Sequence, residues 1–261
     1  MLKTSTCGEQ GGSIMPGLRA APLMLIFLVG MFGTASAAEV NLFCANGARL
    51  MVSALIPEFE RTTNNRVTAR FEEPGILRKS ALNGEPFDLI IMPGRWDEVG
   101  EKLSGNPTGI AHTEFGILVR ADTAKPDTSS NDALKRTLLA ARSIVYTDPK
   151  TGAINGVLFA RVLERLGITE EVNRKSKIVS GPPVGYLARG EVDLAVALAI
   201  NTVDFSNVQF VPMSPDFQAR VTFSGAIAAT TKEAAAAKTL LEFLTGPSAA
   251  PVIKSKGYEP G

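Results

Sequence analysis

The sequence has 261 residues, of which 45% are hydrophobic, and its 27 basic and 26 acidic side chains leave a formal net charge of +1. This length fits one large domain or two small ones. A nearly neutral charge balance argues against nucleic acid or an anionic membrane surface as a partner.

The N-terminal segment has the pattern of a secretory signal peptide, residues 1–37. Lys3 and Arg19 precede an apolar run of 13 residues, Ala20–Phe32, and Ala35-Ser36-Ala37 follows as a small-residue cleavage site. A membrane-spanning helix would need about 20 apolar residues, so an anchor is the weaker interpretation. We therefore expect export of the mature protein to the periplasm.

The mature chain expected after cleavage has 224 residues, with 25 basic and 25 acidic side chains. The sequence leaves open whether translation starts at Met1 or at Met15. Cys44 is the only cysteine of the mature chain, and its apolar surroundings predict core packing rather than reactivity. A chain of this length can bury a large core without disulfides. We expect a monomer.

Short apolar runs alternate with amphipathic segments along the mature chain, which predicts a mostly parallel sheet covered by helices. The expected strands are Val40–Cys44, Arg66–Phe71, Asp88–Met92, Gly116–Arg120, Ser143–Tyr146, Lys177–Val179, Asp193–Leu198, Val208–Val211 and Val221–Ala229. The expected helices are Ala48–Arg61, Pro74–Leu82, Arg95–Leu103, Asp132–Ala141, Gly156–Leu166, Val184–Arg189, Lys232–Leu244 and Pro247–Lys256.

Two α/β series follow each other in this pattern, and they predict an α/β fold of two lobes. Long strands near Gly116–Arg120 and Arg220–Ala229 would join the lobes as two crossovers. Lobe 1 would then contain residues 38–119 and 222–261, and lobe 2 residues 120–221. The C-terminal segment would return to the first lobe.

Three polar loops join an expected strand to an expected helix: Ala45-Asn46-Gly47, Glu72–Gly75 and Thr151–Gly156. The carboxyl ends of parallel strands gather such loops on one edge, where ligands bind. Free N–H groups and the positive end of a helix dipole make such a loop a receptor for anions. Asn46 and Asn155 are the clearest side-chain contributors.

The signatures of several enzyme classes are missing from the sequence. It has no Gly-Lys dipeptide for an ATPase phosphate loop, no G-x-S-x-G elbow, and a single histidine, His112. We expect no metal and no cofactor. Arg95 follows Pro93-Gly94 and could clamp a carboxylate, or it could be a solvated arginine at a helix start.

Several segments resemble the periplasmic solute-binding proteins of the molybdate-binding type. They are VNLFCANGARLMVSALIPEFERTTNNRV, FDLIIMP, ARSIVYTDPKTGAINGVLFARVLERLGI, LARGEVDLAVA and LLEFLTGPSAAPVIKSKGYEPG. The resemblance covers nearly the whole mature chain. It implies the type 2 periplasmic-binding-protein fold, with two crossover strands and an interlobe cleft that closes on an anion. It also implies delivery to an ABC permease.

The resemblance places ligand loops at Ala45–Gly47, Glu73–Gly75, Ala153–Gly156, Gly181–Val184 and near Ala197. The residues expected to bind the ligand are Asn46, Gly47, Pro74, Gly75, Arg95, Ile154, Asn155, Gly156, Pro182 and Ala197.

This chain differs from the molybdate-binding pattern at three of these places. Molybdate binders carry serine hydroxyls in the first two loops, where this chain has Asn46 and Pro74-Gly75. Ala197 stands where they have a tyrosine. The differences favour a different and larger anion, such as an organic polycarboxylate, over a molybdate-like oxyanion.

The chain also resembles the periplasmic aconitate isomerases, which share this fold. Moving a double bond between cis- and trans-aconitate needs a base that removes one proton and returns another, and donors that stabilise the carbanion. The candidate bases are Glu73, His112 and Tyr186, and the candidate partners of the carboxylates are Arg49, Arg78 and Arg95. The sequence leaves the choice among them open, and no catalytic residue is assigned.

Overall fold

The computed structural model describes residues 37–261. Residues 1–36 of the predicted signal peptide, which include both candidate start methionines, lie outside the described residues. Among the described residues, no helix combines the length and the apolar character that crossing a membrane requires.

Ten strands form one mixed sheet in the order β2-β1-β3-β9-β4-β7-β5-β6, with β8 and β10 both paired to β4. The strands are β1 (Glu39–Ala45), β2 (Arg66–Glu72), β3 (Leu89–Pro93), β4 (Thr108–Arg120), β5 (Ile144–Thr147), β6 (Ser176–Val179), β7 (Leu194–Leu198), β8 (Val208–Pro212), β9 (Ala219–Ile227) and β10 (Glu259–Pro260). β1 runs parallel to β2 and β3, and β5 runs parallel to β6 and β7. These two parallel sets are the centres of the two lobes.

The helices that cover the sheet are α1 (Arg49–Thr63), α2 (Pro74–Leu82), α3 (Asn131–Ala140), α4 (Ile154–Leu166), α5 (Thr169–Asn173), α6 (Val184–Ala188), α7 (Ala234–Thr245) and α8 (Ala250–Ser255). Most agree with the expected helices to within a few residues, whereas α5 and the short strand β10 were not predicted. The helix expected over Arg95–Leu103 is only a 3-10 turn, η2 (Asp97–Lys102), with Val99 as its one buried residue. Such a segment has too little apolar surface to hold a longer helix against the sheet.

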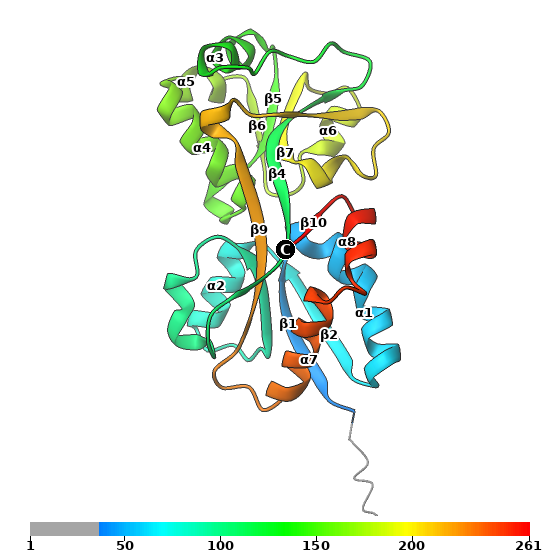
Figure 1. The fold of residues 1–261 in the computed structure, drawn as a ribbon. Helices are drawn as coiled ribbons and strands as arrows, with labels where there is room; N and C mark the ends of the chain where they lie inside the picture. The colour runs from blue at the N-terminus through cyan, green and yellow to red at the C-terminus, as the bar shows by residue number, and fades with distance from the viewer. Residues whose placement is uncertain (1–36) are drawn as a thin grey trace, which may run out of the picture. The chain divides into compact units, whose positions relative to one another are not determined.

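The strands β4 and β9 run side by side between the two parallel sets (Figure 1). They pair antiparallel, from Thr108 opposite Gly225 to Phe115 opposite Ala219. On its other side β9 pairs with β3, and β4 pairs with β7. The expected α/β fold with two crossover strands is therefore confirmed, with parallel strands inside each lobe and antiparallel strands between them. The residue boundaries of the lobes stay a prediction.

The core of the first lobe surrounds β1. Cys44 is completely buried there, as its apolar surroundings indicate. Burial raises the pKa of the Cys44 thiol far above its ordinary value, so the thiol stays protonated and unreactive.

Candidate functional site

A cavity of about 70 Å³ lies where the parallel strands of both lobes end. Residues at or just after the carboxyl ends of these strands form its wall: Asn46 after β1, Glu73 after β2, Pro93 in β3, Thr147 in β5, Gly181 after β6 and Leu198 in β7. Ligands bind at this edge of α/β sheets because the loops and helix starts there expose unpaired polar groups. The topology therefore brings two sets of loops, far apart in the sequence, to one site.

Most of the residues expected to bind the ligand line this cavity. They are Asn46, Gly47, Pro74, Ile154, Asn155 and Pro182. Glu73, which the sequence offered only as a candidate base, lines it as well. Reasoning from the sequence missed Thr147, Asn201 and Phe223, because a strand end, a 3-10 turn and a crossing strand carry no local signal of a ligand site.

Four expected ligand residues do not line the cavity, and two of them are buried by packing. A Cβ atom on Gly156 would lie 2.3 Å from the carbonyl oxygen of Thr147, so this glycine allows α4 to approach the end of β5. Ala197 lies within β7, completely buried and paired with Gly116 of β4. The residue of β7 that reaches the cavity is the next one, Leu198.

The other two, Gly75 and Arg95, lie beside the cavity or outside it. A Cβ atom on Gly75 would lie 2.7 Å from the carbonyl oxygen of Thr151, so the two lobes approach each other backbone to backbone at this point. The side chain of Arg95 is 63% exposed and forms an ion pair with Glu98. The preceding Gly94 has a φ of 83°, a left-handed turn before η2, and the side chain that follows it stays in solvent.

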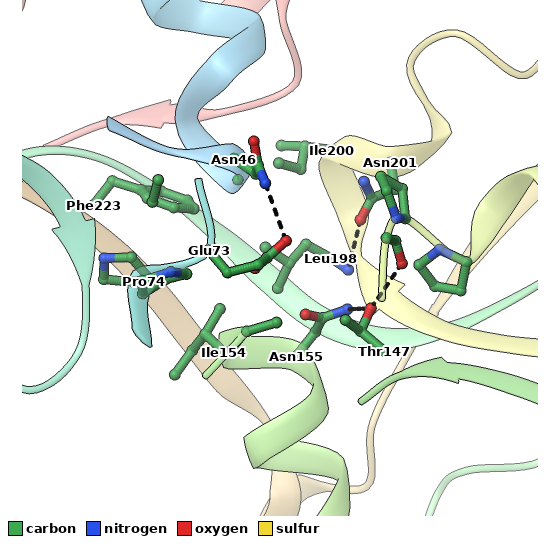
Figure 2. A pocket seen from close by; sticks show the side chains of 17 residues that line it. Asn46, Glu73, Pro74, Thr147, Ile154, Asn155, Leu198, Ile200, Asn201 and Phe223 are labelled. Atoms are coloured by element: carbon green, nitrogen blue, oxygen red, sulfur yellow. Dashed lines mark hydrogen bonds between the residues drawn. The ribbon is translucent and has the colours of Figure 1, made fainter. Parts of the chain in front are cut away.

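The first lobe presents Asn46 and Glu73 to the cavity (Figure 2). The Asn46 Nδ2 group donates a hydrogen bond of 3.1 Å to Glu73 Oε1. Behind it, Arg49 Nη2 donates to Asn46 Oδ1 at 3.1 Å, and the Arg49 guanidinium stacks 4.4 Å from the centre of the Phe71 ring. A guanidinium can only donate hydrogen bonds, so the oxygen of the Asn46 amide faces Arg49. The nitrogen of the same amide therefore faces Glu73.

The Asn46-Gly47 turn is held in place from behind by aromatic residues. The Tyr258 hydroxyl donates to the Gly47 carbonyl oxygen at 2.6 Å, and the Tyr258 ring meets the Phe223 ring edge to face at 6.0 Å. A Cβ atom on Gly47 would lie 2.8 Å from the Phe223 ring, so only glycine fits there without movement. The C-terminal segment therefore positions the Asn46-Gly47 turn at the cavity.

The second lobe presents Thr147, Asn155 and the start of α4. Asn155 Nδ2 donates to Thr147 Oγ1 at 3.0 Å, and Thr147 Oγ1 donates to the Gly181 carbonyl oxygen at 3.2 Å (Figure 2). The N-cap residue of α4, Ala153, has no side-chain oxygen for the first-turn N–H groups. These N–H groups and the helix dipole therefore favour a negative charge in the cavity.

Glu73 is the only ionisable residue of this lining, which contains no lysine, arginine or histidine among the described residues. Burial raises the pKa of Glu73 above its ordinary value, the hydrogen bond from Asn46 opposes the shift, and the charge of Glu72 adds to it. Arg78, a candidate partner of a carboxylate, instead pairs with Glu98 at 3.2 Å. The structure thus places none of the candidate arginines at the cavity.

The two other candidate bases lie away from the cavity. His112 belongs to β4, where it stands opposite Glu259 of β10 and Thr222 of β9. Tyr186 of α6 lies beneath two cations, with Lys177 Nζ 4.0 Å from the centre of its ring. Of the three candidate bases, the structure brings only Glu73 to the site.

The model of the bacterial extracellular solute-binding protein family matches residues 40–259. The chain belongs to this family. Among curated proteins of similar sequence, this solute-binding protein is 25% identical over 233 residues to the aconitate isomerase of Pseudomonas sp., which covers 85% of this chain and 87% of that protein. It is 28% identical over 235 residues to the molybdate-binding protein ModA of Azotobacter vinelandii, with coverage of 86% and 91%.

The fold of this solute-binding protein also occurs in solved structures. A periplasmic thiamin-binding protein superposes with a TM-score of 0.73 and 13% identity, over 87% of this chain and 85% of that one. This likeness shows the fold alone, and the relatives and the structural neighbour are named for different small molecules: aconitate, molybdate and thiamin. The ligand of the present chain must therefore be inferred from its own site.

Proposed function

We propose that this protein captures a small anion between its lobes in the periplasm and delivers it to an ABC-type importer. The observation that carries the proposal is the convergence of donors from both lobes on one cavity, above all the uncapped start of α4 beside Asn155. Neutral amides and helix N–H groups suit an anion because they supply donors without the cost of burying a cation. The signal-like N-terminal segment supports export.

Capture would work as an equilibrium between open and closed arrangements of the lobes. Asn46 and Asn155 come from opposite lobes, so a ligand gains both sets of contacts only when the lobes are close. A ligand shifts such an equilibrium by its differential affinity for the two arrangements. A permease could then distinguish the loaded protein by its closed surface.

A thermal-shift screen tests this proposal with molybdate, tungstate, sulfate, phosphate, citrate and aconitate, against sodium chloride of equal ionic strength. An anion at 100 times its dissociation constant should stabilise the protein by about 2.7 kcal/mol. For a chain of this size, that raises Tm by roughly 5–11 °C. Solution scattering should show compaction with the same anion. If no anion raises Tm and none compacts the protein, the proposal is wrong.

A second candidate function is an aconitate isomerase, which one observation favours: the cavity holds a single carboxylate, Glu73, whose pKa burial raises toward the working range of a general base. Glu73 would take a proton from the methylene carbon of aconitate and return it to the former alkene carbon. The Asn46 and Asn155 amides would face the delocalised carbanion. The candidate ranks second because no cation lines the described cavity to receive three carboxylates.

Incubation with trans-aconitate, followed by measurement of the cis isomer, tests the second candidate. If Glu73 is the base, wild type should turn over and Glu73→Gln should be slower by about 100-fold to 10,000-fold. Wild-type protein without turnover removes the isomerase. Turnover that survives in Glu73→Gln would show that another group moves the proton.

A further inference from the structure

Glu73 places a hydrogen-bond acceptor inside a cavity whose other polar groups favour an anion. Its Oε1 atom receives the hydrogen bond from Asn46, and no second hydrogen bond reaches the carboxylate within residues 37–261. No basic side chain of the described chain lies within 4.0 Å of it as an ion-pair partner. One face of the carboxylate therefore remains for the ligand.

The network behind Glu73 keeps the carboxylate an acceptor. Arg49 holds the oxygen of the Asn46 amide, which leaves the Asn46 N–H₂ group for Glu73 Oε1. Glu73 is the N-cap residue of α2, but its side chain makes no capping hydrogen bond and faces the cavity instead. Burial raises the pKa of Glu73 because it disfavours the charged form, and an O–H donor on the ligand would favour the charged form again by hydrogen bonding to it.

An anion facing this carboxylate has two possible outcomes. If every oxygen of the anion is an acceptor, two desolvated acceptors oppose each other, and neither can donate a hydrogen bond to the other. If the anion carries an O–H group, that group donates to the carboxylate in a short, charge-assisted hydrogen bond. Specificity of this kind comes from an unfavourable contact with the wrong ligand as much as from a favourable contact with the right one.

We propose that Glu73 determines specificity at this site, selecting small anions that carry their own O–H donor and rejecting fully deprotonated oxyanions. Monohydrogen phosphate and 2-hydroxycarboxylates have the required donor, whereas sulfate, molybdate and tungstate lack it. The inference rests on the proposed capture of an anion and names the chemical class of the ligand. In the loop where molybdate binders carry a serine hydroxyl, this chain would present the ligand with the carboxylate acceptor of Glu73.

Matched pairs of ligands test the inference by calorimetric titration of the full mature protein. Phosphate and sulfate share a tetrahedral shape and differ in the O–H group, and glycolate and acetate differ in one hydroxyl. Binding within the first pair would identify a phosphate as the source of the O–H donor, and binding within the second pair would identify a hydroxycarboxylate. We expect the donor-bearing member of that pair to bind about 100-fold or more tightly than its partner, because the site's acceptor stays unpaired with the other.

Glu73→Gln tests the assignment to this residue, since the amide has the same shape, no charge and a donor of its own. We expect the variant to bind sulfate at least about tenfold more tightly than wild type does. The ratio of the affinities for phosphate and sulfate should therefore fall sharply. Glu72→Gln is the matched control: it removes the same charge one residue earlier, outside the cavity, where Glu72 lies 3.9 Å from Arg70. Glu72 affects Glu73 only through its charge and does not line the cavity, so this control should change the affinity ratio within the pair far less than Glu73→Gln does.

Each contrary result has its own meaning. Wild-type protein that binds sulfate or molybdate as tightly as phosphate and glycolate would overturn the inference and leave the capture of anions standing. Glu73 would not be the selective residue if Glu73→Gln left the affinity ratio within the ligand pair unchanged. The same conclusion would follow if Glu72→Gln changed that ratio equally. If no anion of any class binds, the proposed function fails together with the inference. The ligand pairs use wild-type protein, so their result does not depend on the folding of a variant.

Discussion

Gly156→Ala should lower Tm by roughly 6–12 °C and abolish ligand binding. Alanine in a helix is ordinarily about 1 kcal/mol better than glycine. Here the added Cβ atom would lie 2.3 Å from the carbonyl oxygen of Thr147 and 3.1 Å from the nitrogen of Pro149, both backbone atoms. Because neither can rotate away, α4 must move off the end of β5. Overpacking of this kind costs about 3 kcal/mol, which corresponds to that range of Tm for a chain of this size.

Binding should fail in Gly156→Ala because the same movement separates two polar groups of the cavity. Asn155 of α4 and Thr147 of β5 are joined by a hydrogen bond of 3.0 Å that cannot persist if the helix shifts by about an ångström. Thermal unfolding and calorimetric titration measure the two effects. Gly100→Ala is the control, since its Cβ atom would meet nothing within 4 Å. An unchanged Tm for Gly156→Ala would contradict the close packing of α4 on β5.

Gly75→Ala should weaken ligand binding about 5-fold to 150-fold while leaving the ligand-free protein as stable as wild type. The position is in the first turn of α2, where alanine is acceptable to the helix. Across the interlobe contact, however, the new Cβ atom would lie 2.7 Å from the carbonyl oxygen of Thr151 and 3.3 Å from the Cα atom of Gly152. This overlap exists only when the lobes are close, so its cost of about 1–3 kcal/mol falls on the bound form.

Calorimetry with the best anion of the screen measures this loss, and solution scattering should show less compaction in Gly75→Ala than in wild type at saturating ligand. Gly100→Ala again provides the control, because it makes the same change on a surface turn of the same lobe. Wild-type affinity in Gly75→Ala would mean that the lobes bind the ligand without approaching each other at Gly75 and Gly152. A loss of stability without ligand would mean that the contact also supports the free protein.

The elements of the fold were predictable because burial imposes a period on the sequence. The apolar runs of β1, β3, β5 and β7 and the stripe of α4 follow from strand and helix geometry alone. The 13 residues of β4 were only partly predicted, since polar residues such as His112 and Glu114 interrupt its N-terminal half. β4 and β9 stabilise that half by pairing, a long-range interaction that no local pattern records.

The candidate site, like the fold, was predictable from the sequence only in part. The sequence by itself determined that polar loops with Asn46 and Asn155 follow parallel strands, because strand direction and loop position are local properties. Only the tertiary structure decided which neighbouring residues face the cavity: Glu73 lines it, whereas Gly156 packs against Thr147. Side-chain direction at a helix start depends on what packs against it across the sheet. The sequence thus predicted an anion receptor, and tertiary packing placed a carboxylate inside it.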